Sequence, residues 1–256
     1  MGNIKTIILS GGYGTRLSEV TETIPKPMVK VGDKPIVCHI MEIYASYGYK
    51  DFFLALGHKS EVIKNFFLNY NHLSSDLSID LKNNTTRFLN KNDHDWNVNL
   101  IDTGKSTMTG GRLKRLKDYV NETFFLTYGD GLSDINIQDL LSFHKSHGKL
   151  VTVTAVHPVA RFGELDLNKD IVKNFSEKPN VNDGWINGGF FVMEPEFLQY
   201  ISADDTVLEK EPLESLARDN QLMAFRHEGF WQCMDTKRDL DNLNRLWTSE
   251  VCPWKK

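Results

Sequence analysis

Cysteine is scarce in this chain, and the few cysteines present are widely separated. Cys38, Cys233 and Cys252 are odd in number and include no CxxC pair. This pattern argues against a secreted disulfide framework and against a thiolate zinc site, and it is typical of a reducing cytosol. A chain of 256 residues can bury enough surface to fold without either device. We therefore expect a cytoplasmic protein.

Long apolar runs and an excess of positive charge are also missing. The first apolar run, Thr6 to Leu9, is far too short for the hydrophobic region of a signal peptide or for a membrane span. With 30 basic and 34 acidic residues, the formal net charge is −4, so the chain lacks the global positive field of non-specific nucleic-acid binders. We expect neither a membrane nor a nucleic acid as a partner, and any bound anion must be held by a local site.

Several catalytic motifs are absent from the sequence. No Gly-Lys-Ser/Thr follows a glycine-rich loop, so there is no P-loop, and Leu17 stands where the GxGxxG fingerprint needs its third glycine. No G-x-S-x-G elbow supports a serine hydrolase. The eight histidines include no HExxH, and the pair His144 and His147 does not by itself make a metal site.

The order of the predicted elements indicates an α/β fold. A strand over 5–9 is followed by a helix that Pro35 opens and Gly48 closes, a strand over 51–56, and a helix over 61–70 with Ser60 as its N-cap. This alternation implies right-handed crossovers and a mostly parallel central sheet flanked by helices. The remaining patterns predict strands over 77–81, 96–101, 124–127, 151–155, 164–167, 171–175, 185–192 and 223–227, helices over 111–119, 140–147, 195–201, 211–219 and 237–247, and a small hairpin excursion over the polar stretch 83–95. With no repeat and no linker, we expect a single domain over 1–256.

A glycine-rich segment follows the first predicted strand. Residues 9–17 are Leu-Ser-Gly-Gly-Tyr-Gly-Thr-Arg-Leu. The three glycines let the backbone approach a ligand closely and direct its N–H groups at an anion, and Arg16 adds a guanidinium that can bind phosphate oxygens. The alternative is a glycine turn with a purely structural role.

Lys26 lies in a rigid loop between Pro25 and Pro27. The two prolines hold the backbone around the lysine extended. If Lys26 lies near Arg16, its ammonium is a pre-positioned charge for a triphosphate. If it does not, it is a solvated lysine, which is the common fate of lysines.

Two aspartates are candidates for holding a divalent cation. Asp130, in Tyr128-Gly129-Asp130-Gly131, directly follows a predicted strand, at the edge where α/β sheets bind ligands. Mg²⁺ prefers one or two carboxylates together with phosphate oxygens. Asp235 offers the second carboxylate just before the last predicted helix, although it could also simply cap that helix.

Three further segments have the composition of a ligand site. Glu177 and Lys178 pair a carboxylate with an ammonium before a proline, and Asn187 precedes two glycines within an aromatic strand. A second glycine-rich loop, residues 107–113, leads into a helix and is suited to contacting a base through backbone groups. Most basic residues of that helix are expected to be solvated, with Arg112 as the exception.

The order of these segments resembles the sugar-1-phosphate nucleotidyltransferase family: Gly-Gly-x-Gly-Thr-Arg-Leu, Pro-Lys-Pro-Met, Tyr-Gly-Asp, Glu-Lys-Pro and Asn-Gly-Gly, over nearly the whole chain. The resemblance implies a Rossmann-like fold, a homo-oligomer and a Mg²⁺ ion held by Asp130 and Asp235. It implies catalytic roles for Arg16, Lys26, Asp130, Lys178 and Asp235. It places the sugar phosphate at Gly163, Glu177, Lys178 and Asn187, and the nucleotide at Leu9, Ser10, Gly11, Gly12, Tyr13, Gly14, Thr15, Arg16, Lys26, Thr107, Thr109, Arg112 and Gly129.

Within the family, the segment Thr109-Gly110-Gly111-Arg112 is similar to members that use CTP, because uridylyl and thymidylyl relatives usually carry Gly-Thr-Ala-Gly there. The resemblance implies CTP and glucose 1-phosphate as substrates. The alternatives are another sugar 1-phosphate, uridylyl or thymidylyl transfer, or a regulatory homologue that binds nucleotide without chemistry. Transfer between two polyanions needs in-line positioning and positive charge rather than a covalent intermediate, and the basic residues above would supply that charge.

Overall fold

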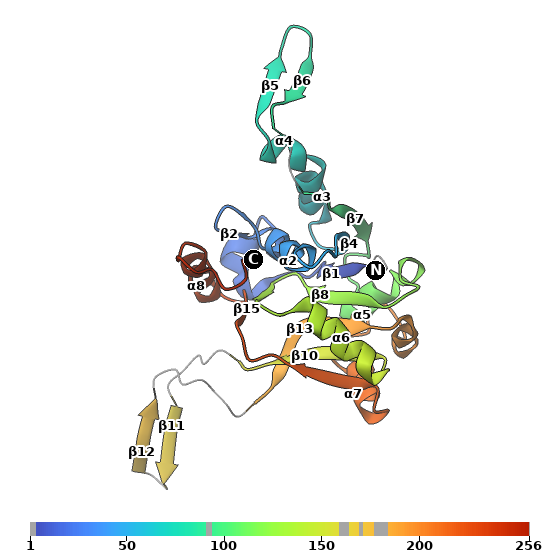
Figure 1. Ribbon diagram of the computed structural model, residues 1–256, viewed down its shortest axis with the longest axis vertical. Helices are drawn as coiled ribbons and strands as arrows, with labels where there is room; N and C mark the ends of the chain where they lie inside the picture. The colour runs from blue at the N-terminus through green and yellow to red at the C-terminus, as the bar shows by residue number, and fades with distance from the viewer. Residues whose placement is uncertain (1–3, 91–93, 159–163, 169–170, 177–183, 256) are drawn as a thin grey trace.

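A computed structural model describes residues 4–90, 94–158, 164–168, 171–176 and 184–255. Its centre is a seven-stranded sheet (Figure 1) in the order β14–β10–β13–β8–β1–β4–β7. β13 runs antiparallel to both of its neighbours, and the other pairings within this sheet are parallel, which confirms the predicted α/β class. The strands are β1 (Thr6–Ser10), β4 (Asp51–Leu56), β7 (Asn97–Asp102), β8 (Phe124–Tyr128), β10 (Val151–Val156), β13 (Ile186–Met193) and β14 (Leu222–Arg226).

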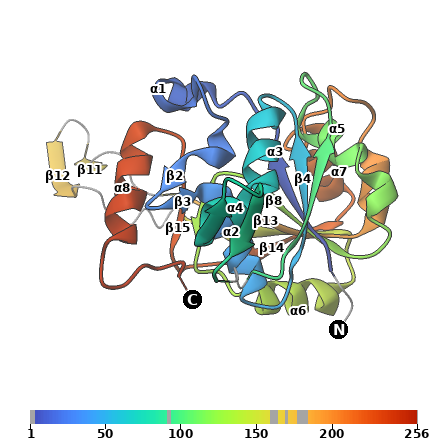
Figure 2. The same ribbon diagram turned by 90° about the horizontal axis from the view of Figure 1, so that it is seen from above.

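Both faces of this sheet are covered, because its inner strands are apolar at successive positions. In β1, Ile7 and Ile8 are both fully buried but belong to different hydrophobic clusters, since neighbouring side chains of a strand point to opposite faces. The cluster around Ile8 includes residues of the helices α2 (Ile36–Ala45), α3 (Ser60–Leu68), α6 (Ile137–His147) and α8 (Lys237–Trp247). The cluster around Ile7 includes residues of α5 (Thr109–Lys114), the 3₁₀ turn η4 (Pro195–Tyr200) and α7 (Glu211–Arg218). Figure 2 shows α8 at one side of the molecule and α5 and α7 at the other.

The helices are short to medium in length, and none in the described part of the chain is long and apolar enough to span a membrane. The α-helices are α1 (Ser18–Thr21), α2 (Ile36–Ala45), α3 (Ser60–Leu68), α4 (Tyr70–Ser74), α5 (Thr109–Lys114), α6 (Ile137–His147), α7 (Glu211–Arg218) and α8 (Lys237–Trp247). The 3₁₀ turns are η1 (Thr15–Leu17), η2 (Lys26–Met28), η3 (Lys117–Tyr119) and η4 (Pro195–Tyr200).

In the part of the chain that the structure describes, four two-stranded sheets accompany the central one. They are β2–β3 (Lys30–Val31 and Lys34–Pro35), β5–β6 (Leu77–Asp80 and Thr85–Phe88), β9–β15 (Gly131–Ser133 and Trp231–Cys233) and β11–β12 (Glu164–Asn168 and Ile171–Ser176). β5 is the strand expected over 77–81, and it pairs with β6 inside the polar stretch, so the hairpin begins earlier than the expected 83–95. Together with α4 it forms an arm, residues 70–89, that projects from the body of the molecule in Figure 1.

Two local predictions are wrong. Ser60 is the first residue of α3 rather than its cap, and the cap position is taken by Lys59 in a left-handed conformation (φ 55°). The Lys59 ammonium donates to the carbonyl oxygens of Thr21 and Glu22 instead of serving the helix, so a tertiary contact decides this turn. The single helix expected over 111–119 is divided into α5 and the turn η3, because the Leu116 N–H donates to the Leu113 carbonyl three residues back and the α-helical ladder does not continue.

Candidate active site

A large cleft lies at the carboxyl ends of β1 and β8, the edge of an α/β sheet where ligands bind. Every predicted site residue that the structure describes lines it. These are Leu9, Ser10, Gly11, Gly12, Tyr13, Gly14, Thr15, Arg16, Lys26, Thr107, Thr109, Arg112, Gly129, Asp130, Asn187 and Asp235. The other three, Gly163, Glu177 and Lys178, lie outside the described residues.

The glycine-rich loop after β1 is fastened on both sides. Thr21 Oγ1 lies 2.9 Å from the carbonyl oxygens of Gly14 and Leu17, and the Gly11 carbonyl accepts from the backbone N–H of His58 at 3.2 Å. The Tyr13 ring packs on the His58 ring with 4.7 Å between centroids. A backbone that is already held in place can direct its N–H groups at an anion without a further loss of conformational entropy on binding.

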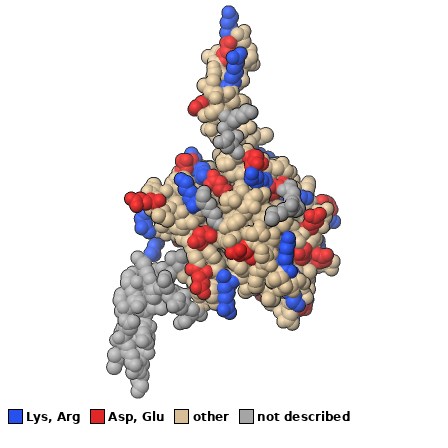
Figure 3. All heavy atoms as spheres, in the orientation of Figure 1, with Lys and Arg blue, Asp and Glu red and all other residues tan. Residues whose placement is uncertain are grey.

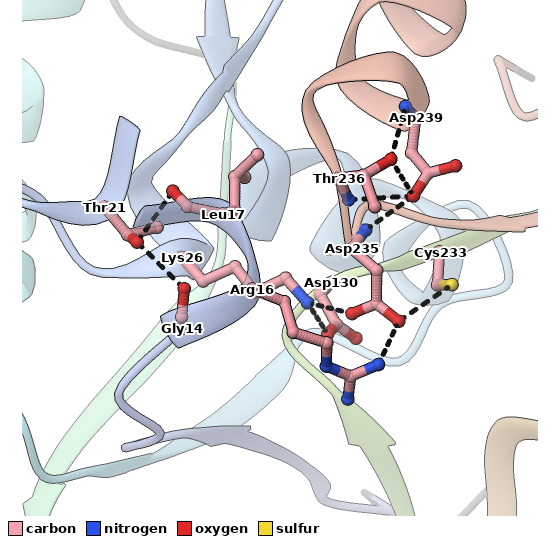
Figure 4. A network of polar contacts seen from close by, with 10 residues as sticks. All are labelled: Gly14, Arg16, Leu17, Thr21, Lys26, Asp130, Cys233, Asp235, Thr236 and Asp239. Carbon is pink, nitrogen blue, oxygen red and sulfur yellow. Dashed lines mark hydrogen bonds and ion pairs between the residues drawn. The ribbon is translucent and has the colours of Figure 1, made fainter. Parts of the chain in front are cut away.

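Lys26 Nζ lies between two carboxylates in the cleft (Figure 4). It is 2.6 Å from Asp130 Oδ2 and 2.6 Å from Asp235 Oδ1. Burial acts to lower the pKa of Lys26, but the charges and hydrogen bonds of the two aspartates outweigh it and the pKa is raised. Lys26 is therefore a fixed positive charge. Arg16, largely exposed, donates from Nη1 to Asp235 Oδ2 at 2.8 Å, so two cations and two carboxylates meet beside the glycine-rich loop.

The same pair of carboxylates fits a divalent cation. The ammonium of Lys26 contacts both carboxylates at once, so an oxygen of Asp130 and an oxygen of Asp235 are close enough to share one cation. Among the described residues no group of three or more His, Cys, Asp or Glu side chains could hold a metal. Two carboxylates suffice for Mg²⁺ when phosphate oxygens and water supply the other ligands. Asp130 and Asp235 are thus the residues that could hold it, with Lys26 as the competing cation.

Two very short strands bring these carboxylates together. β9 begins directly after Asp130, and β15 ends two residues before Asp235. The two strands pair antiparallel, with Gly131 opposite Cys233, and the backbone N–H of Met234 donates to the Asp130 carbonyl at 2.9 Å. This pairing places the two aspartates side by side despite their distance in the sequence. Neither strand was predicted, because three residues carry no measurable periodicity.

Asp235 does not cap the last helix. Thr236 is the N-cap of α8, and it forms a capping box with Asp239. The Asp239 carboxylate accepts from the Thr236 backbone N–H at 2.8 Å and from the Asp235 backbone N–H at 3.1 Å. The helix therefore has its own cap, and the Asp235 carboxylate faces Lys26 and Arg16.

Arg112 is 4% exposed, and its guanidinium donates to the protein itself. Its nitrogens contact the carbonyl oxygens of Gly11 (2.9 Å), Leu56 (3.0 Å) and Gly104 (2.7 Å) and the hydroxyl of Thr103 (2.9 Å). A Cβ at Gly11 would lie 2.3 Å from the guanidinium, so this glycine is required by the close approach. Arg112 thus ties the loops that follow β1 and β7 to the end of β4. A direct contact between Arg112 and nucleotide stays a prediction.

Glu209 is a cleft residue that the sequence analysis missed. Its carboxylate accepts from Tyr128 Oη at 2.6 Å and from Thr109 Oγ1 at 2.8 Å. Asn187 donates from Nδ2 to Tyr128 Oη at 3.2 Å, so it joins the same network. In the sequence Glu209 stands between Leu208 and the charged pair Lys-Glu, which reads as a solvated surface run and carries no motif.

The charges lining one edge of the cleft, with an anion-binding loop beside them, suit the transfer of groups between phosphate esters, and this is the class of enzyme that the fold and the site define. The chain belongs to the nucleotidyl transferase family, whose model matches residues 5–249. It is 49% identical over 254 residues to the glucose-1-phosphate cytidylyltransferases of Salmonella typhimurium and Salmonella typhi, a match that covers 98% of this chain and 99% of each relative. The family resemblance read from the sequence is confirmed.

Among solved structures, the chain is similar to HddC from Yersinia pseudotuberculosis complexed with GMP-PN, with a TM-score of 0.69 and 22% sequence identity. The match covers 96% of this chain and 100% of that one. A similar match is found to UDP-glucose pyrophosphorylase complexed with UDP-glucose, with a TM-score of 0.66, 17% identity and coverage of 96% and 98%. At these identities the likeness shows the Rossmann-like nucleotidyltransferase fold alone.

Proposed function

We propose that this enzyme transfers the cytidylyl group of CTP to α-D-glucose 1-phosphate and releases CDP-glucose and pyrophosphate. The observation that carries the proposal is the cluster in which Lys26 and Arg16 meet Asp130 and Asp235 beside the glycine-rich loop. The names of the relatives from Salmonella typhimurium and Salmonella typhi, which match over nearly their full length, support this choice of substrates.

The proposed reaction is an in-line displacement at the α-phosphorus. A phosphate oxygen of glucose 1-phosphate forms the new bond to phosphorus, the bond to the bridging oxygen of the β-phosphate breaks, and pyrophosphate leaves with that electron pair. The obstacle is negative charge approaching negative charge. Lys26 and Arg16 would lower it by neutralising phosphate oxygens, and Lys178 would bind the phosphate of the sugar. A Mg²⁺ ion between Asp130 and Asp235, when bound, would supply further positive charge there.

In this proposal the two substrates bind at different halves of the central sheet. The loops after β1 and β7, with Gly11 and Thr107 among their residues, would hold CTP. The strands β8 and β13, with Asn187 on the second, would face the sugar together with Glu177 and Gly163. Cytosine presents a donor amine where uracil presents an acceptor, so backbone carbonyl oxygens of a glycine-rich loop suit it. Arg112 would act by holding those loops in place.

The test is pyrophosphate release with CTP, UTP, dTTP and GTP against several hexose 1-phosphates. We expect CTP with glucose 1-phosphate to give the highest kcat/KM, with CTP exceeding UTP by at least about tenfold, the penalty of roughly one lost hydrogen bond. Lys26→Ala should abolish most turnover, whereas Lys30→Ala, an exposed lysine four residues further on, should not. Equal use of CTP, UTP and dTTP would refute the cytidylyl assignment, and release of no pyrophosphate would favour the non-catalytic homologue.

We also propose that the enzyme is a homo-oligomer located in the cytoplasm. The arm supports assembly, because large apolar side chains on it are exposed, among them Leu73 (72%), Leu81 (89%) and Leu89 (68%). An isolated two-stranded hairpin such as β5–β6 is only marginally stable in water, so contact with a second copy of the chain would stabilise it. Figure 3 shows that the arm also carries charges of both signs. The free cysteines support a reducing compartment.

The oligomer is tested by light scattering after gel filtration. We expect the wild type to have a mass of two or more times 29.4 kDa and Leu81→Lys to form a smaller species. Val251→Lys is the matched control, because Val251 is 79% exposed but lies outside the arm. A wild type that elutes as a monomer would refute the proposal.

A further inference from the structure

Glu209 is a negative charge in a cleft that must accept two polyanions. The residues that line the cleft include the cations Arg16 and Lys26 as well as Glu209 and Tyr128. A carboxylate close to the phosphates of either substrate would oppose binding by charge repulsion. Asp130 and Asp235 pair with the Lys26 ammonium, whereas Glu209 accepts from two neutral hydroxyl groups, so its carboxylate suits a part of a substrate that carries no charge.

The hydrogen bonds around Glu209 leave it as an acceptor toward the cleft. Tyr128 Oη and Thr109 Oγ1 each have a single proton, and each donates it to a different oxygen of the carboxylate, at 2.6 Å and 2.8 Å. The Thr109 oxygen also accepts from the backbone N–H of Leu208 at 2.9 Å, which fixes the direction of its proton. A carboxylate oxygen can accept more than one hydrogen bond, so capacity remains for a donor from a ligand.

The state of Tyr128 agrees with this polarity. Its hydroxyl donates to Glu209 Oε1 at 2.6 Å and accepts from Asn187 Nδ2 at 3.2 Å, so its single proton is directed at the carboxylate. Asn187 is fixed as well, because its Oδ1 accepts from the backbone N–H of Gly189 at 2.8 Å while its Nδ2 points at Tyr128 Oη. A carboxylate acceptor and an amide donor thus belong to the same network, which is the pairing that a sugar hydroxyl satisfies.

The network lies where the part of the cleft assigned to the sugar meets the part assigned to the nucleotide. Tyr128 ends β8 and Asn187 lies on β13, the strands assigned to the sugar, whereas Thr109 begins α5, after β7. Tyr128 is also two residues from Asp130, so their Cα atoms are at most about 7.6 Å apart. The network is thus within the reach of a hexose whose phosphate lies at the cation cluster.

We propose that Glu209 accepts a hydrogen bond from a hydroxyl group of the hexose ring and thereby selects the sugar 1-phosphate. The inference rests on the proposed function, because it names a further residue of the same site. It makes Glu209 a substrate-binding residue, with Tyr128 and Thr109 as the residues that position it.

The experiment compares the wild type with Glu209→Gln in pyrophosphate release, using glucose 1-phosphate and its monodeoxy and epimeric analogues. A carboxylate that accepts from a hydroxyl is lost in the variant, so kcat/KM for glucose 1-phosphate should fall by about tenfold or more while the KM for CTP stays within about twofold. For the analogue that lacks the recognised hydroxyl, the variant and the wild type should have nearly equal kcat/KM. Glu211→Gln, an exposed glutamate two residues further on at the start of α7, is the matched control and should leave both values unchanged.

The outcomes separate this inference from the proposed function. If the wild type is active and Glu209→Gln weakens CTP as much as glucose 1-phosphate, or leaves the selectivity among analogues unchanged, the inference is overturned while the proposed function stands. If the wild type uses another sugar 1-phosphate, the same comparison with analogues of that sugar decides the role of Glu209. Tyr128→Phe should weaken the same discrimination less than Glu209→Gln does, since it only frees the carboxylate to move. A wild type without turnover on any pair overturns both.

Discussion

Lys26 and Asp235 are 209 positions apart in the sequence, yet Lys26 Nζ and Asp235 Oδ1 are separated by only 2.6 Å. The same ammonium is 2.6 Å from Asp130 Oδ2. The lysine thus satisfies both carboxylates that could hold Mg²⁺. A divalent cation and the ammonium compete for the same oxygens, and phosphates of a bound nucleotide would offer the lysine another partner.

This competition predicts tighter metal binding when the lysine is removed. In the absence of nucleotide, Lys26→Met should bind Mn²⁺ at least about tenfold more tightly than the wild type, which corresponds to about 1.4 kcal/mol. The measurement is Mn²⁺ titration followed by electron paramagnetic resonance. Lys30→Met is the control, since Lys30 is exposed and outside the cleft. Unchanged or weaker Mn²⁺ binding by Lys26→Met would show that the ammonium does not compete for the carboxylates.

Substitutions of two neighbouring residues at the start of α8 should have different effects, one on the free energy of unfolding and the other on turnover. Thr236→Ala removes the helix cap and should lower the free energy of unfolding by about 1 kcal/mol with little change in turnover. Asp235→Asn leaves the cap intact and should lower turnover about a hundredfold or more, because it removes charge at the reacting phosphates. Chemical denaturation and initial rates measure the two effects. A variant at 235 that loses stability but keeps turnover would assign Asp235 a structural role.

Arg112 should matter for both the fold and CTP binding. Arg112→Ala leaves buried carbonyl oxygens, those of Gly11 and Leu56 among them, without this donor, and should cost about 2–4 kcal/mol of unfolding free energy. Loosening of the loop after β1 should raise the KM for CTP. Arg112→Lys should not rescue either property, because an ammonium lacks the planar fork that reaches several acceptors.

The control for Arg112 is Arg115→Ala, which breaks an ion pair with Asp204 at the surface. Exposed pairs of this kind contribute little to stability, so the denaturation midpoint should not move measurably. If Arg112→Ala behaves in the same way as Arg115→Ala, then the buried guanidinium does not hold the loops together.

A buried histidine should make stability depend on pH. His144 is 2% exposed, and its ring nitrogens contact Thr152 Oγ1 at 2.8 Å and Glu194 Oε1 at 3.0 Å. Burial lowers the pKa of His144 despite the opposing effect of Glu194, and the pKa of His147 beside it is also lowered, with burial as the main cause. The unfolded chain therefore binds more protons than the folded one below about pH 6.5, and stability falls as the pH falls through that value.

The measurement is the denaturation midpoint at pH 7.5 and pH 5.5. His144→Gln should reduce the difference between the two midpoints, even if it lowers both. His72→Gln, at an exposed position on α4, should leave the difference unchanged. A difference that persists in His144→Gln would assign the pH dependence to other groups.

The part of the site that could be predicted consists of residues that follow strands. The glycine-rich loop, Lys26 and Asp130 come directly after predicted elements or between prolines, so their position at the cleft follows from topology. Glu209 could not be found in this way, because its function depends on Tyr128 and Thr109, which are far away in the sequence. The role of Arg112 as a tie between loops was missed for the same reason.

By itself, the sequence determined the α/β class, the family and most of the cleft, because hydrophobic periodicity and short motifs are local features. They can be recognised without knowing which strands pair. It left open whether Asp235 caps a helix or faces a substrate. Only the tertiary structure decided this, through the pairing of β9 with β15 and the capping box of Thr236 and Asp239. Each of these depends on backbone groups brought together by the folded chain, and no local pattern records which distant groups will meet.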